Sequence, residues 1–96
     1  MVFRDADLRK FESIVSETEN GMDSLQGMFV LPHVKPKLPE GSSQDFVLGY
    51  ALGRISGVFS GYYRCEHRSE MKTEEYRESF FLLLDQAERL RRSIGT

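Results

Sequence analysis

Residues 46–63 read FVLGYALGRISGVFSGYY, and this stretch decides the fold of the chain. Glycine recurs in it at every fourth position. A helix turns once in about 3.6 residues, so this spacing places the glycines on one slowly drifting face. Each glycine costs roughly 1 kcal/mol relative to alanine inside a helix, and close approach of another backbone is the expected compensation. The four positions are Gly49, Gly53, Gly57 and Gly61.

The other side of this predicted helix is bulky. It carries Val47, Leu48, Ala51, Leu52, Ile55, Val58, Phe59, Tyr62 and Tyr63, whereas Tyr50 and Arg54 flank the glycine side. A helix that is apolar on one side and small on the other is typical of an element packed between two layers. The glycine side is therefore predicted to be an interface, either within the chain or across a dimer.

A second helix is predicted over about residues 5–19. Leu8, Phe11, Ile14 and Val15 share one side of it, with charged residues around the rest. Acidic residues at the start favour the positive end of the helix dipole. The Asn20–Gly21 pair is a strong stop signal.

A third helix is predicted from about Thr73 to the C-terminus. Its apolar stripe consists of Tyr76, Phe80, Leu83, Leu84, Ala87, Leu90 and Ile94. Phe81 and Leu82 lie off this stripe and indicate a second contact surface. Because only a short polar stretch separates this helix from the central one, the two should form an antiparallel helical hairpin.

Residues 22–41 have no clear period. The apolar run 27–31 could form a short strand, which would make the fold α+β instead of mainly α. Pro32, Pro36 and Pro39 exclude an α-helix after it. We expect an extended, proline-containing connector over about residues 31–41, and a single small domain spanning residues 1–96.

Composition and charge narrow the function classes. The net charge of −2 lacks the basic excess typical of nucleic-acid binding. Cys65 is the only cysteine, which excludes an intramolecular disulfide and a multi-thiolate zinc site. Arg54 at the centre of residues 46–63 opposes a membrane span. With no secretory signal at the N-terminus, the expected location is the cytoplasm.

Candidate chemistry is sparse. On a helix, Glu70 could face one metal ion together with Glu66 or His67, but no second motif supplies the remaining ligands. No nucleophile with its base is recognisable near Cys65. We therefore predict no catalytic residues, no metal and no cofactor. The alternative to a packing interface is a groove along the glycine side that binds a small molecule or an anion through Arg54, Tyr50 and His67, in a protein that could then also be an enzyme.

The sequence thus favours a mainly α protein, with a C-terminal helical hairpin, that acts without catalysis in protein–protein interaction or regulation. A homodimer is expected, because a chain this short has a modest core of its own. The predicted interface consists of Gly49, Gly53, Gly57, Gly61, Tyr50, Arg54, Phe81 and Leu82.

Overall fold

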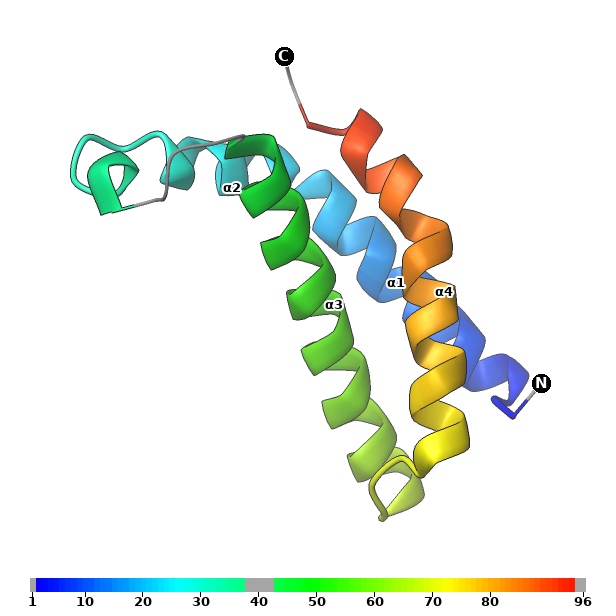
Figure 1. Ribbon diagram of the computed structural model, residues 1–96. Coiled ribbons are helices and arrows are strands. Elements are labelled where there is room, and N and C mark those ends of the chain that lie inside the picture. Colours follow the sequence, from blue (N-terminus) through cyan, green and yellow to red (C-terminus); the bar gives the residue numbers. More distant parts are fainter. Residues whose placement is uncertain (1, 38–42, 95–96) are drawn as a thin grey trace.

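The computed structural model describes residues 2–37 and 43–94, and within them the chain is helical with no strand (Figure 1). This confirms the predicted mainly α fold. The α-helices are α1 (Asp5–Asn20), α2 (Met22–Phe29), α3 (Ser43–His67) and α4 (Thr73–Arg92), and a 3₁₀ turn, η1, spans Lys35–Lys37.

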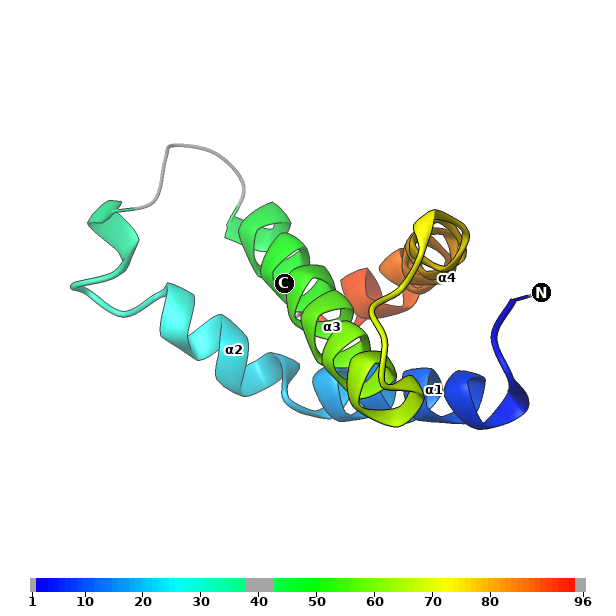
Figure 2. The ribbon, with the colours of Figure 1, turned by 90° about the horizontal axis from the view of Figure 1, so that it is seen from below.

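The helices form two layers. Helices α3 and α4 make an antiparallel hairpin, and α1 crosses the back of it (Figures 1 and 2). Helix α2 continues from the end of α1 and reaches out past the N-terminal end of α3, which gives the molecule its elongated shape of 42 × 22 × 18 Å. The side of the hairpin opposite α1 is left facing the viewer of Figure 1.

The core lies where α1 meets the bulky side of α3. Phe59 sits at its centre with 1% of its surface exposed. The rings of Phe3 and Phe11 approach it edge-on, with centroids at 5.3 and 5.2 Å. Edge-to-face pairs add to the free energy of burial. Other buried side chains around them are Ile14, Val15, Met22, Val47, Leu48, Ala51, Ile55, Tyr63, Met71, Leu90 and Ile94.

The alternative prediction of a strand near residues 27–31 is wrong. Met22, Leu25 and Phe29 share one side of α2 and pack against the core, which is helical spacing. After α2, residues 31–37 form consecutive turns instead of an extended connector, with the N–H of Val34 donating to the Leu31 carbonyl at 3.0 Å. The rest of the predicted connector, residues 38–41, lies outside the described residues.

The residue directly after α3 has a strained backbone conformation. Arg68 follows His67 with φ of 55°, in the left-handed region that favours glycine. We expect Arg68→Gly to raise the free energy of unfolding by about 0.5–1 kcal/mol, measured by urea titration. Ser69→Gly is the matched control, because Ser69 is not in that region and should gain nothing. A lower stability for Arg68→Gly would contradict this account.

Candidate interaction surface

The glycine side of α3 is bare. A Cβ added at Gly49, Gly53, Gly57 or Gly61 would meet no atom within 4 Å beyond its own helical backbone. The expected packing between two layers is therefore not realised within the described residues, because only the bulky side of α3 is covered. In the part of the chain that the structure describes, no close contact on this side offsets the cost of the four glycines.

Two shallow hollows follow this bare side over residues 50–64 of α3. One, of about 450 Å³, is lined by Tyr50, Gly53, Arg54, Gly57 and Val58. The next, of about 180 Å³, also begins at Gly57 and reaches across to Tyr76 of α4. Gly57 belongs to both, so the hollows form one trough along α3, which we call the α3 trough.

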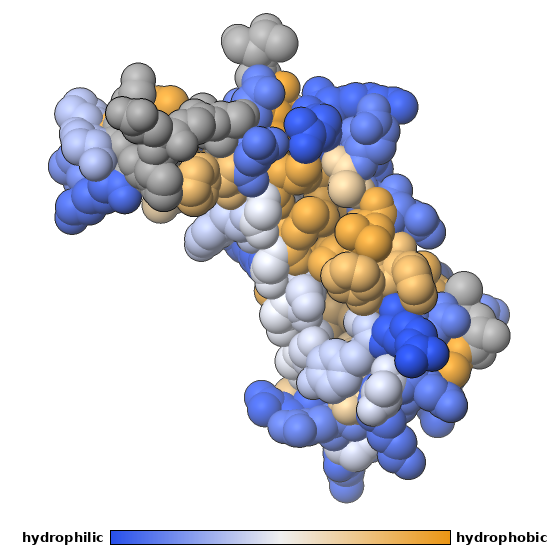
Figure 3. All heavy atoms as spheres, in the orientation of Figure 1, coloured by the Kyte–Doolittle hydropathy of each residue, from blue (hydrophilic) through white to orange (hydrophobic). Residues whose placement is uncertain are grey.

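Bulky apolar side chains stand beside this trough on α4. Tyr76, Phe80 and Leu84 follow one another at four-residue spacing and are 50, 57 and 48% exposed. Phe81 is 56% exposed, and its ring contacts that of Phe80 at 6.1 Å between centroids. We call these four residues the α4 ridge. In Figure 3 the apolar patch over α4 borders the paler strip over α3, and both face the same side.

The predicted interface residues therefore fall in different environments. The four glycines, Tyr50 and Arg54 line the bare side of α3, and Phe81 is exposed on α4. Leu82 instead packs against the core and is only partly accessible. Leu84 and Phe80, assigned from the sequence to the core-facing stripe, point outward.

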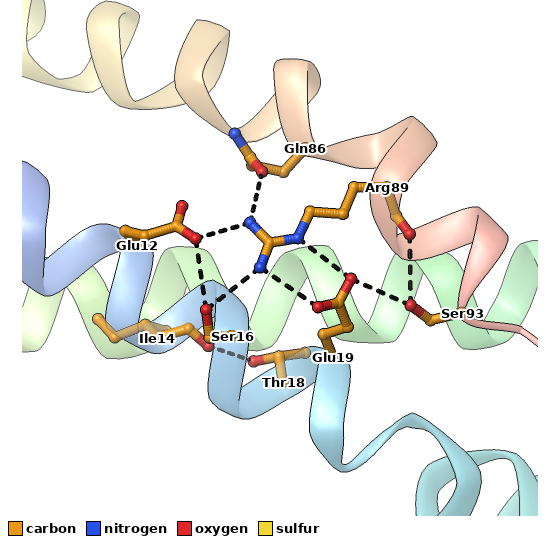
Figure 4. A network of polar contacts seen from close by, with 8 residues as sticks. All are labelled: Glu12, Ile14, Ser16, Thr18, Glu19, Gln86, Arg89 and Ser93. Carbon is orange, nitrogen blue, oxygen red and sulfur yellow. Dashed lines mark hydrogen bonds and ion pairs between the residues drawn. The ribbon is translucent and has the colours of Figure 1, made fainter.

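A polar network between α4 and α1 explains why α4 is turned about its axis so that Phe80 and Leu84 point outward (Figure 4). The guanidinium of Arg89 donates to Glu12 at 2.7 Å, to Glu19 at 3.1 and 3.2 Å and to the Ser16 hydroxyl at 3.2 Å. Hydrogen bonding from Arg89 holds the pKa of Glu19 below its usual value although partial burial opposes this. Because Arg89 must face α1, Phe80 and Leu84 are turned away from it.

A second polar cluster joins the start of α1 to the end of α3. Asp7 is 1% exposed, and its carboxylate lies 3.0 and 3.1 Å from Nε2 of His67. It also accepts hydrogen bonds from the Tyr62 hydroxyl at 3.1 Å and the Arg4 N–H at 3.2 Å. The His67 ring stacks on Tyr63 with centroids 4.0 Å apart. Every buried polar group here has a partner, so the cluster acts as a structural clasp.

The contact with Asp7 keeps His67 away from Tyr50 and Arg54, the other two residues of the predicted ligand groove. Tyr50 and Arg54 line one hollow of the α3 trough. His67 lies 13 residues beyond Arg54, which is about 20 Å along a helix, and its Nε2 is directed at Asp7. The three side chains are not brought together. No local pattern signals the Asp7–His67 pair, because its members are 60 residues apart.

Fold and surface together define a small all-α protein with a glycine-floored trough and an apolar ridge side by side. No protein-family model, no curated protein and no solved structure is significantly similar to this chain. None of the helices in residues 2–37 and 43–94 has the length and apolar character needed to cross a bilayer.

Proposed function

We propose that this protein is a noncatalytic, cytoplasmic interaction protein that works as a homodimer, docking through the α3 trough and the α4 ridge. The bare glycine side carries the proposal. Four glycines at four-residue spacing destabilise an isolated helix, and among the described residues a Cβ added at any of them would meet no atom within 4 Å beyond its own helix. Close packing against a second molecule gives this pattern a physical reason.

The apolar surface beside the trough supports the same function. Exposed residues of α3 and α4 meet there without a break, because Gly57 and Tyr76 line one hollow. Contiguous apolar patches of several hundred Å² are uncommon on monomers and mark interaction sites. A docking face of this kind would serve a regulatory role through binding, without catalysis.

Substitution at a trough glycine tests the proposal. Gly57→Leu is expected to weaken the dimer about tenfold to a hundredfold, since an added side chain overpacks a close contact. The same change should leave the subunit folded, and even raise its helix stability, because there is open space around Gly57. Native mass spectrometry and sedimentation would measure the subunit count, and thermal unfolding would measure the fold.

Gly27→Leu is the matched control. Gly27 lies in α2, also has open space around it and is not part of the trough. It should stabilise the helix without changing the mass of the assembly. If Gly57→Leu behaves like Gly27→Leu in both measurements, or if the unmodified protein is a monomer, the proposed function is wrong.

A further inference from the structure

The α4 ridge and the α3 trough run at the same level in one subunit. Two contacts set the register of the hairpin: Tyr63 donates to Glu75 at one end, and Arg91 pairs with Asp45 at the other. Counting along both helices between these contacts, successive ridge residues lie level with successive trough glycines. Tyr76 is level with Gly61, Phe80 with Gly57, and Leu84 with Gly53.

This match makes the surface complementary to itself. A two-fold axis in front of the hairpin, parallel to α3 and α4 and midway between them, sets the trough of each subunit against the ridge of the other. Each bulky residue then faces a glycine, at the same four-residue spacing. We propose that the dimer forms by this reciprocal packing, with the α4 ridge of each copy seated in the α3 trough of its partner; this rests on the proposed function.

The exposed apolar area suffices for such an interface. Tyr50, Val58 and the four ridge residues are each about half exposed. Because an aromatic side chain carries about 150–250 Å², they offer on the order of 600 Å² per subunit. A stable interface buries about 800 Å² per partner. The backbone of the glycines and the polar residues beside the trough need to supply only the remaining area.

Charge selects this arrangement over the other two-fold packing. Arg54 lies nine residues from Tyr63, which faces α4, and so projects about 180° away from α4. Asp85 lies nine residues from Tyr76, which faces α3, and so projects away from α3 by the same amount. Among the described residues neither has an ion-pair partner. Reciprocal packing brings Arg54 beside Asp85 of the other copy.

In the alternative, a two-fold axis perpendicular to the helices would set α3 against α3. Arg54 lies near the middle of the trough, so the Arg54 side chains of the two subunits would then lie side by side. Two like charges at a partly desolvated contact are unfavourable. The self-complementary spacing and the opposite charges therefore point to the same partner, a second copy, in the same orientation.

Charge reversal tests the packing. Arg54→Glu and Asp85→Arg should each weaken dimerisation about tenfold, and the double variant should restore it to within about threefold. Sedimentation equilibrium gives the dissociation constants, and circular dichroism checks that the fold is unchanged. If a dimer forms but the two effects simply add, reciprocal packing is wrong while the proposed function stands. If the unmodified protein is monomeric at every concentration, both fail.

Cross-linking gives an independent answer. In a Cys65→Ser background, Gly57→Cys and Phe80→Cys proteins are oxidised separately and after mixing, and non-reducing gels show the products. Reciprocal packing predicts a covalent dimer only in the mixture. A dimer from Gly57→Cys protein alone would mean that the trough faces itself and would overturn the proposal.

Discussion

Replacing Phe59 by alanine should lower the free energy of unfolding by about 3–5 kcal/mol, the usual cost of removing a buried aromatic ring. Its ring fills the space between α1, α3 and the N-terminal segment, where Phe3 and Phe11 both pack against it. A cavity there removes the contacts of Phe59 with both of these rings. The total free energy of unfolding of a domain of this size is about 5–15 kcal/mol. Urea unfolding followed by circular dichroism will therefore resolve the loss.

Two variants calibrate that result. Phe59→Leu keeps most of the volume and should cost at most about 1.5 kcal/mol. Met28→Ala removes an apolar side chain that is 60% exposed on α2, and should change stability by less than about 0.5 kcal/mol. Similar losses for Phe59→Ala and Met28→Ala would contradict the placement of the core.

Asp7→Ala should cost about 3 kcal/mol at neutral pH. The carboxylate is the shared acceptor for His67, Tyr62 and the Arg4 N–H, and its removal leaves these donors partly buried without a partner. Asp5→Ala is the control, because Asp5 lies exposed in the same first turn and contributes through the helix dipole only about 0.5 kcal/mol. Equal losses for the two variants would argue against the clasp.

The clasp also predicts a pH dependence. Burial by itself raises the pKa of Asp7, but hydrogen bonds from His67, the Arg4 backbone and Tyr62 outweigh it and hold that pKa below its usual value. The stabilisation is therefore complete above the unfolded-state pKa of about 3.9 and is lost as the pH falls through the lower folded-state value. The difference in unfolding free energy between the unmodified protein and Asp7→Ala should stay constant near neutral pH and shrink below about pH 4. A difference that is independent of pH down to pH 2 would contradict this.

The rotation of α4 shows where prediction from the sequence stops. Phe81 and Leu82 widen the apolar side of this helix beyond the stripe, so hydrophobic periodicity predicts its existence but not which edge of that side is buried. The pattern places Phe80 and Leu84 on the apolar stripe and Leu82 off it, whereas Leu82 packs on the core and the other two are exposed. The orientation is decided by Arg89 and its carboxylate partners on α1, about 70 residues earlier in the chain.

Local pattern determined the helices of this protein. Helical spacing of apolar residues, the stop at Asn20–Gly21 and the short polar link before Thr73 predicted α1, α3, α4 and the hairpin, because these signals act between residues a few positions apart. Tertiary structure alone decided the rest. It buried Asp7 against His67, left the glycine side of α3 bare and turned the α4 ridge outward, since each depends on contacts between segments far apart in sequence, which no local pattern encodes.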